Sequence, residues 1–346
     1  MPSDAQRPSK WDAPYPDFAY SESRDAALRR CARAHYHATF TAWRGWAAPA
    51  GSASWLAYRL KKSTPLAAAI GSVVHEAATR CVRSVLAGHR LPTLHELRRE
   101  AADALNAMWV NSRTRRQAFL RRPADVPTPM LQELLYGEQP TPEALRSARA
   151  KLDRTLGNLL ACDQLWTDVA AAGPSGVITV DRFYQFALAP GGVTVFAAPD
   201  LILAPPGARP TLIDFKTSGA DGVIDQILTY ALAARDGLQL DVGEGCMGQV
   251  VALDAAPADR VSRFAIFPED IDAAADRVRD NVARMQALLA DVPTNTPRPI
   301  EAFEQTTNAR TCRGCAYRAL CWPEHRIADV PEGTPTTRPE PAAAGV

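Results

Sequence analysis

The feature that most constrains this chain of 346 residues is a pair of charges set against an apolar segment. Asp214 and Lys216 follow Thr211-Leu212-Ile213, an apolar run with strand character. Because side chains alternate across a strand, Asp214 and Lys216 share one face while Phe215 faces the other way, into a core. Burying such charges is costly unless they are paired, hydrated or bound to metal. The motif therefore predicts a polar site on one face of a sheet.

A second carboxylate lies on the apolar segment that precedes this motif. Asp200 falls within residues 193–204, and Pro205-Pro206-Gly207 supplies a turn before residue 211. A hairpin of the two segments brings Asp200 beside Asp214. Two carboxylates and one lysine on adjacent strands suit a hard divalent cation with a water to activate.

Two helices contribute further candidates. His75 lies among apolar residues of a helix expected from Leu66 to about Leu86, where neutral imidazole is either a metal ligand or a core histidine satisfied by a hydrogen bond. Gln226 and Tyr230 are four residues apart on a helix expected over about 224–235, so they share a face. They either hold Lys216 or a substrate phosphate, or Tyr230 packs while Gln226 faces water.

The order of the predicted elements indicates a mixed α/β core fed by a hairpin. Strand-like segments are expected at 177–188, 193–204, 211–215, 247–253 and 261–267. The chain divides into a disordered N-terminus (1–18), N-terminal helices (19–92), a helical insertion (93–172), the mixed α/β core (173–290), a cysteine segment (291–327) and a disordered tail (328–346).

Composition excludes several classes of protein. With 47% hydrophobic and 22% charged residues the chain is core-forming rather than disordered. It has no apolar run long enough for a bilayer and no apolar signal core near Met1, so we expect a cytoplasmic protein without a membrane partner. A net charge of +1 gives no global basic field, although clustered arginines suit phosphate contacts or form a solvated face. No P-loop motif is present, so the sequence contains no P-loop motor of its own.

A cysteine cluster near the C-terminus predicts a metal site. The spacing C-x2-C-x5-C is formed by Cys312, Cys315 and Cys321. In a chain without an export signal this pattern favours metal over disulfides, and Cys31 is the best candidate for a fourth ligand. A compact triplet with one distant cysteine fits a [4Fe-4S] cluster better than structural zinc, although His35 or His325 completing a zinc site is the alternative. Either metal would staple the two ends of the chain.

Together these residues resemble the PD-(D/E)XK nuclease superfamily, in particular the RecB-type nuclease domains with an iron–sulfur cluster. That group includes the AddB nuclease domain and CRISPR-associated exonucleases. The matches run from about residue 21 to 322 and comprise Gly71, His75 and Glu76; Pro199 and Asp200; Asp214 and Lys216; Gln226 and Tyr230; and Cys31, Cys312, Cys315 and Cys321. The chain departs from the family at Ala32, where proline is frequent, and residues 93–172 carry no recognised motif.

The resemblance implies a restriction-endonuclease-like fold, in which helices flank a mixed central sheet, and an enzyme that hydrolyses phosphodiester bonds with Mg²⁺ or Mn²⁺. The implied metal ligands are His75, Asp200, Asp214 and the carbonyl of Phe215. The implied catalytic residues are Asp200, Asp214, Lys216, Gln226 and Tyr230, with Lys216 orienting the attacking water. The expected nucleic-acid contacts are Arg33, Tyr36, Arg115 and Arg116.

The expected function is that of a DNA exonuclease acting on single strands or DNA ends in repair, recombination or phage and CRISPR-type defence. A helicase or another recombination or defence protein is the expected partner. Two alternatives stay open: a catalytically idle DNA-end-binding subunit of a helicase–nuclease complex, and an RNA-processing nuclease.

Overall fold

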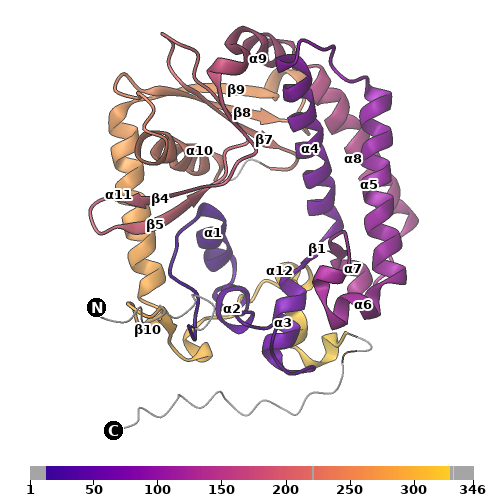
Figure 1. Ribbon diagram of the computed structural model, residues 1–346. Helices are drawn as coiled ribbons and strands as arrows, with labels where there is room; N and C mark the ends of the chain where they lie inside the picture. The colour runs from indigo at the N-terminus through magenta and orange to yellow at the C-terminus, as the bar shows by residue number, and fades with distance from the viewer. Residues whose placement is uncertain (1–12, 220–221, 328–329, 331–346) are drawn as a thin grey trace, which may run out of the picture.

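The computed structural model describes residues 13–219, 222–327 and 330. It contains a five-stranded sheet in the order β3–β6–β7–β8–β9, whose strands β7, β8 and β9 lie in the upper half of Figure 1. Its strands are β3 (Val177–Val180), β6 (Leu201–Leu203), β7 (Thr211–Lys216), β8 (Cys246–Ala252) and β9 (Val261–Ile266). The middle strand β7 pairs antiparallel with β6 and parallel with β8, which confirms the predicted mixed sheet.

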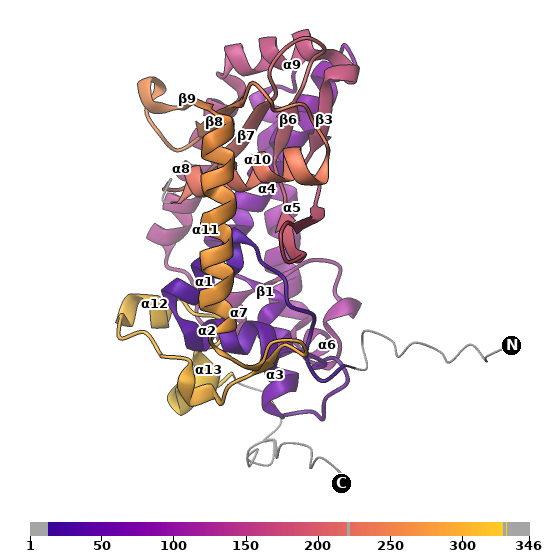
Figure 2. The same ribbon diagram turned by 90° about the vertical axis from the view of Figure 1, so that its left-hand side faces the viewer.

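Helices cover both faces of the sheet, and the alternation of β7 decides which side chains meet them (Figures 1 and 2). Ile213 and Phe215 pack in one core with α4 (Leu66–Leu86), α5 (Leu94–Thr114), α8 (Pro142–Leu160) and α9 (Asp163–Gly176). Leu212 packs in the other core with α10 (Val223–Leu232) and α11 (Pro268–Gln286). The α/β architecture with helices on both sides of a mixed sheet is consistent with a restriction-endonuclease-like fold.

Helix α4 has the predicted bounds, and its start depends on a distant segment. Its N-cap residue, Pro65, offers no side-chain acceptor. The carboxylate of Glu133, in α7 (Gln132–Leu135), instead accepts hydrogen bonds from the Leu66 amide at 3.0 and 3.1 Å. A carboxylate at this position also interacts favourably with the helix dipole, so α7 stabilises the helix that carries His75.

Residues 93–172, which we expected to form a helical insertion, are mostly helical and are built into the same core as the rest of the fold. Leu156 and Trp166 lie in one buried cluster with residues of α4 and the sheet. Within this mostly helical segment, short strand β2 (Met130–Leu131) pairs in parallel with β1 (Ser63–Thr64). The remaining helix in this segment is α6 (Arg116–Arg121).

Two strands predicted as continuous are each divided, and those predictions are wrong. Between residues 177 and 188 the chain turns at Asp181, which has φ 48°, and then forms β4 (Tyr184–Leu188). β4 pairs with β5 (Val193–Ala197) in a separate two-stranded ribbon. Between β5 and β6 lies Pro199, which has no amide hydrogen to donate to a sheet ladder. This break places Asp200 just before β6.

Segments from both ends of the chain gather at one end of the molecule (Figure 1). They are α1 (Glu22–Arg30), α2 (Ala32–Tyr36), α3 (Ala53–Lys61), β10 (Leu289–Asp291), β11 (Thr296–Pro297), α12 (Ala309–Arg313) and α13 (Arg318–Cys321). Short π or 3-10 turns occupy His37–Thr41, Pro123–Asp125, Ala233–Gly237, Pro257–Asp259, Ile300–Ala302 and Pro323–His325. The Arg33 amide donates to the Glu304 carbonyl at 3.1 Å, so direct hydrogen bonds also join the two ends.

The predicted disordered N-terminus is wrong for residues 13–18, which contact the fold. Trp43 donates to the Ala13 carbonyl at 2.9 Å, and Asn295 donates to the Pro16 carbonyl at 2.7 Å. Residues 1–12 of that predicted segment lie outside the described residues, as does the predicted tail at 328–346 except for Val330. In the described part of the chain, none of the helices combines the length and apolar character needed to traverse a lipid bilayer.

Candidate active site

The two acids predicted to meet lie together at the end of the β6–β7 pair. Leu201 pairs with Ile213, so Asp200, one residue earlier on an antiparallel strand, lies beside Asp214. Asp200 Oδ2 accepts a hydrogen bond from the Phe215 amide at 2.7 Å. Burial, reinforced by the charge of Asp200, raises the pKa of Asp214 although Lys216 and Tyr230 lower it in part.

His75 reaches this acid pair from α4. Its Nδ1 lies 3.1 Å from Asp200 Oδ1. One turn earlier, a Cβ on Gly71 would stand 3.3 Å from Thr217 Oγ1, so glycine permits the close approach of α4 to the end of β7. Burial lowers the pKa of His75, but the hydrogen bond to Asp200 and the charges of Asp200 and Asp214 raise it overall. The predicted meeting of one imidazole and two acids is thus present.

Lys216 closes a cycle of polar contacts with Asp214 and α10. Its Nζ lies 2.7 Å from Asp214 Oδ2 and donates to Gln226 Oε1 at 2.7 Å. Gln226 Nε2 donates to the hydroxyl of Tyr230, which donates to Asp214 Oδ1 at 3.1 Å. Burial and the charges of Asp214 and Asp200 raise the pKa of Tyr230, so it stays a donor. Of the alternatives left open by the sequence, Gln226 holds Lys216 directly, and Tyr230 supports that contact through its hydrogen bonds with Gln226 and Asp214.

The donor types around Asp214 fit a hard divalent cation. Carboxylate oxygens, an imidazole and a neighbouring backbone carbonyl are groups that Mg²⁺ or Mn²⁺ accepts. Asp214 Oδ2 has no hydrogen-bond partner among the described residues and is balanced only by the ammonium of Lys216. Across residues 13–219 and 222–327, however, no three His, Cys, Asp or Glu side chains form a ready-made ion site. In this state His75 and Lys216 occupy the carboxylate oxygens that a cation would use.

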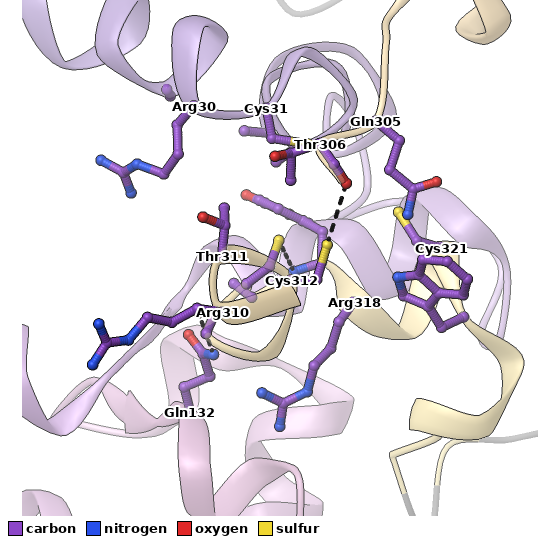
Figure 3. Close-up of a pocket in the computed structure, with 18 of the residues that line it drawn as sticks. Arg30, Cys31, Gln132, Gln305, Thr306, Arg310, Thr311, Cys312, Arg318 and Cys321 are labelled. Carbon is purple, nitrogen blue, oxygen red and sulfur yellow. Dashed lines mark hydrogen bonds between the residues drawn. The ribbon is translucent and has the colours of Figure 1, made fainter. Parts of the chain in front are cut away.

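The four predicted cysteine ligands line one cavity of about 420 Å³, shown in Figure 3. Cys31 enters it from the junction of α1 and α2, and the other three come from the segment of α12 and α13. All four cysteines are free thiols. Burial, together with the nearby Cys315 thiol, raises the pKa of Cys321 to about 11, so metal binding here has to displace protons.

The zinc alternative requires His35 or His325 at the cysteine cavity. Among the described residues, the lining of the cysteine cavity includes neither His35 nor His325. His35 lines a separate small cavity with Phe40. The histidine that approaches the cysteines is His37, whose Nε2 lies 3.8 Å from Cys321 Sγ; burial and the charge of Arg33 lower its pKa to about 4.

The four residues predicted to contact nucleic acid fall into two structural settings. Arg33 Nε donates to the Phe303 carbonyl at 2.9 Å, and the Tyr36 ring packs 4.8 Å from that of Phe303. Arg115 and Arg116 lie at the junction of α5 and α6, among the helices at the cysteine end and away from β7 (Figure 1). A contact between these residues and nucleic acid stays a prediction.

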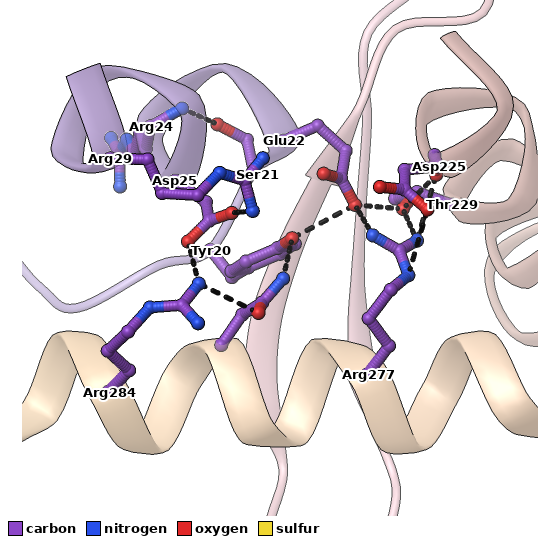
Figure 4. Close-up of polar contacts among 11 residues, drawn as sticks. Tyr20, Ser21, Glu22, Arg24, Asp25, Arg29, Asp225, Thr229, Arg277 and Arg284 are labelled. Atoms are coloured by element: carbon purple, nitrogen blue, oxygen red, sulfur yellow. Dashed lines mark hydrogen bonds and ion pairs between the residues drawn. The ribbon is translucent and has the colours of Figure 1, made fainter. Parts of the chain in front are cut away.

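Sequence reasoning missed a polar network that fixes α1 beside the candidate site (Figure 4). Glu22 pairs with Arg277 of α11 at 2.9 Å and accepts from Thr229 of α10 at 2.7 Å. Asp25, fully buried, pairs with Arg284 of α11 at 2.7 Å. An acid in the first turn of a helix ordinarily indicates a favourable interaction with the helix dipole, so the sequence carried no signal of these distant partners.

Comparisons with known proteins bear on the family. None of the curated proteins matches the chain. One matching solved structure is titled "Crystal structure of SSO0001"; it shares 15% identity at a TM-score of 0.25, over 52% of this chain and 80% of that chain. The family model described as the PD-(D/E)XK nuclease superfamily matches residues 19–322. That span includes the sheet, α4, α10 and all the residues gathered around Asp214, and the chain therefore belongs to the PD-(D/E)XK nuclease superfamily.

Proposed function

We propose that this member of the superfamily is a metal-dependent DNA exonuclease that acts on single strands or DNA ends. The observation that carries the proposal is the closed cycle of Asp214, Lys216, Gln226 and Tyr230 beside Asp200 and His75. Removing a carboxylate and a lysine from water costs more free energy than burying apolar side chains of similar volume would. The stability of the fold therefore does not explain why this pair is present. A catalytic role accounts for that cost.

The residues divide the chemistry among them. His75, Asp200, Asp214 and the Phe215 carbonyl would hold Mg²⁺ or Mn²⁺. When bound, such an ion supplies a Lewis acid and lowers the pKa of a water. Gln226 and Tyr230 position Lys216, whose ammonium would orient the attacking water and stabilise the negative charge that develops on the phosphate oxygens. Cleavage of the P–O3′ bond leaves a 5′-phosphate and a 3′-hydroxyl.

We also propose that the cysteine cavity holds a [4Fe-4S] cluster, in the manner of RecB-type nuclease domains. Its support is the shared cavity of Cys31, Cys312, Cys315 and Cys321 and the absence of disulfides among the described cysteines. A protein purified without oxygen that is brown and contains iron would agree with this proposal. A colourless protein containing zinc would contradict it.

Nuclease activity is tested on anaerobically purified protein with end-labelled single- and double-stranded DNA, Mn²⁺ and an EDTA control. Asp214→Ala and Lys216→Ala are expected to abolish cleavage and leave DNA binding largely intact. Full activity of Lys216→Ala would end the catalytic assignment, and binding without cleavage by the unmodified protein would identify an idle DNA-end-binding subunit. Competition with RNA of equal length separates an RNA-processing nuclease.

The proposed setting is repair, recombination or phage and CRISPR-type defence, with a helicase or similar protein as partner. Its support is the likeness to RecB-type domains and the lack of a P-loop motif in the chain. Co-purification of an ATP-dependent helicase with the tagged chain, and faster cleavage of duplex DNA when that helicase is added, would support this partnership.

A further inference from the structure

A groove of about 400 Å³ opens directly beside the candidate active site. Gln226 and Tyr230 of α10 form part of its lining, and Arg24, Phe183 and Phe196 form another part. The groove therefore extends from the residues beside Lys216 to Arg24, Phe183 and Phe196, which take no part in the hydrogen bonds around Asp214. Its volume lies in the range of pockets that take small organic ligands.

Two phenylalanine rings give the groove an aromatic wall. Phe183 is 60% exposed, the most exposed of the large hydrophobic side chains in the described part of the chain. Its ring lies 4.9 Å from that of Phe196, at an interplanar angle of 50°. The loop that carries Phe183 is tied to the active site, because the Asp181 amide donates to the Asp200 carbonyl at 2.8 Å. An exposed ring held in this place offers a face on which a planar group can stack.

Arg24 supplies a positive charge that the groove does not neutralise. Its guanidinium lies 5.2 Å from the centre of the Phe196 ring and donates to the Ala19 carbonyl at 2.7 Å. It forms no ion pair with any residue of the described chain. The acid in the lining, Glu22, is already paired with Arg277 at 2.9 Å, so Arg24 is the charge left for an anion.

The helix that carries Arg24 is fixed on both sides. Figure 4 shows Glu22 reaching Arg277 and Thr229, while Asp25 reaches Arg284. These contacts anchor α1 to α10 and α11 at the residues that flank Arg24. The backbone that carries Arg24 is therefore held in a constant relation to α10, and the Phe196 amide ties the aromatic wall to the segment before α1 by donating to the Tyr20 carbonyl at 2.8 Å. A preformed site of this kind favours binding because little freedom is lost.

We propose that this groove binds one unpaired nucleotide of the DNA strand next to the phosphate that is cleaved. The base stacks on Phe183 and Phe196, and Arg24 contacts a phosphate of the same strand. The inference rests on the proposed nuclease function and specifies its substrate. A base that is paired inside a duplex cannot enter the groove, so the site selects single strands and frayed ends.

The test compares Phe183→Ala with Phe267→Ala, a phenylalanine of similar exposure (49%) outside the groove lining. Binding of fluorescein-labelled oligothymidylate is measured by anisotropy in EDTA, and cleavage is measured with Mn²⁺. Loss of one stacked base is expected to weaken binding and kcat/KM by about tenfold or more in Phe183→Ala, and to leave Phe267→Ala unchanged. Because Phe183 is largely exposed, both variants are expected to unfold at the same temperature as the unmodified protein.

Two further measurements isolate the contacts. For the unmodified protein, an abasic site at the nucleotide next to the scissile phosphate is expected to weaken binding by the same factor as Phe183→Ala. For Phe183→Ala, the abasic site is expected to cause no further loss of binding. Arg24→Gln is expected to reduce the slope of log Kd against log salt concentration by the amount that one phosphate contact contributes. Arg146→Gln, on helix α8 outside the groove, is expected to leave this slope unchanged.

The outcomes separate the two proposals. Binding that depends on Phe183 without any cleavage would overturn the nuclease function and support the groove. Cleavage and binding that are the same in Phe183→Ala, Phe267→Ala and the unmodified protein would overturn the groove and leave the nuclease function standing.

Discussion

Replacing Lys216 by methionine in the metal-free protein tests the physical basis of the site through stability alone. The side chain of Asp214 is 2% exposed and that of Lys216 23% exposed, with 2.7 Å between Oδ2 and Nζ. Methionine keeps an unbranched side chain and removes the charge. The change therefore leaves a buried carboxylate whose hydrogen bond from Tyr230, at 3.1 Å, is retained and whose counter-charge is lost.

The expected cost follows from the burial of Asp214. Breaking a buried ion pair costs about 3–5 kcal/mol, and the partial exposure of Lys216 favours the lower limit, about 3 kcal/mol at pH 8. The folded pKa of Asp214 is raised above its unfolded value of 3.8. The folded state then holds this proton more tightly, so stability falls as pH rises through the folded pKa. Removing Lys216 raises that pKa further, so the cost is smaller at about pH 5 than at about pH 8.

Urea unfolding in EDTA at the two pH values measures both quantities. Lys151→Met is a matched control, because Lys151 is 25% exposed and lies 4.0 Å from Asp254, whose side chain is 33% exposed. Asp254 also pairs with Arg154, so the control is expected to lose less than about 1 kcal/mol at either pH. An equal loss of unfolding free energy in Lys216→Met and Lys151→Met would refute the expectation that the burial of Asp214 makes its ion pair costly to break. A loss from Lys216→Met that is the same at both pH values would refute it as well.

Three other changes test the metal ligand, the cysteine cavity and the network of α1. The raised pKa of His75 means that in the metal-free protein its stabilising contribution is complete below its unfolded pKa of 6.5 and is lost as pH rises through the folded pKa. Metal binds the neutral imidazole of His75, so a proton on the ring competes with it. The affinity for Mn²⁺, measured by calorimetry, is therefore expected to fall by up to about tenfold for each pH unit below the folded pKa of His75. His75→Ala is expected to remove this pH dependence. Cys312→Ser is expected to remove the brown colour and lower the melting temperature by several degrees, whereas Cys246→Ser, at a buried cysteine outside the cavity, keeps the colour. Arg284→Met is expected to lower the free energy of unfolding in urea by about 2 kcal/mol, because it removes one of the two arginines that pair with the fully buried Asp25 and leaves only Arg29. Arg279→Met, at an exposed ion pair, is the control, and a smaller loss from Arg284→Met than from Arg279→Met would contradict this expectation.

Much of the candidate site followed from short-range patterns. The alternation of residues 211–216 predicted that Asp214 and Lys216 share a face, and they form an ion pair. The spacing of four residues predicted that Gln226 and Tyr230 share a helix face, and they are hydrogen-bonded. Such patterns succeed because the periods of strands and helices act over a few residues and need no knowledge of the partner.

Pattern reasoning failed where one residue or one distant contact outweighed an apolar run. The left-handed backbone at Asp181 and the proline at residue 199 divided segments that read as continuous strands. The turn at Asp181 also placed Phe183 between β3 and β4, so a side chain that reads as part of a strand lines a groove instead. Helix α4 likewise begins against the carboxylate of Glu133, 67 positions away.

The sequence by itself therefore determined the residue types of the site, the local face on which each is presented, and the family to which the chain belongs. The meeting of His75 and Asp200 across 125 positions was expected only through the resemblance to a family, because no local pattern links the two residues. Tertiary structure alone decided that Glu22 and Asp25 lock α1 onto α10 and α11, and that a groove opens beside Gln226. The physical reason is that local periodicity reflects backbone geometry, whereas contacts between distant segments depend on how whole helices and sheets pack around a shared core.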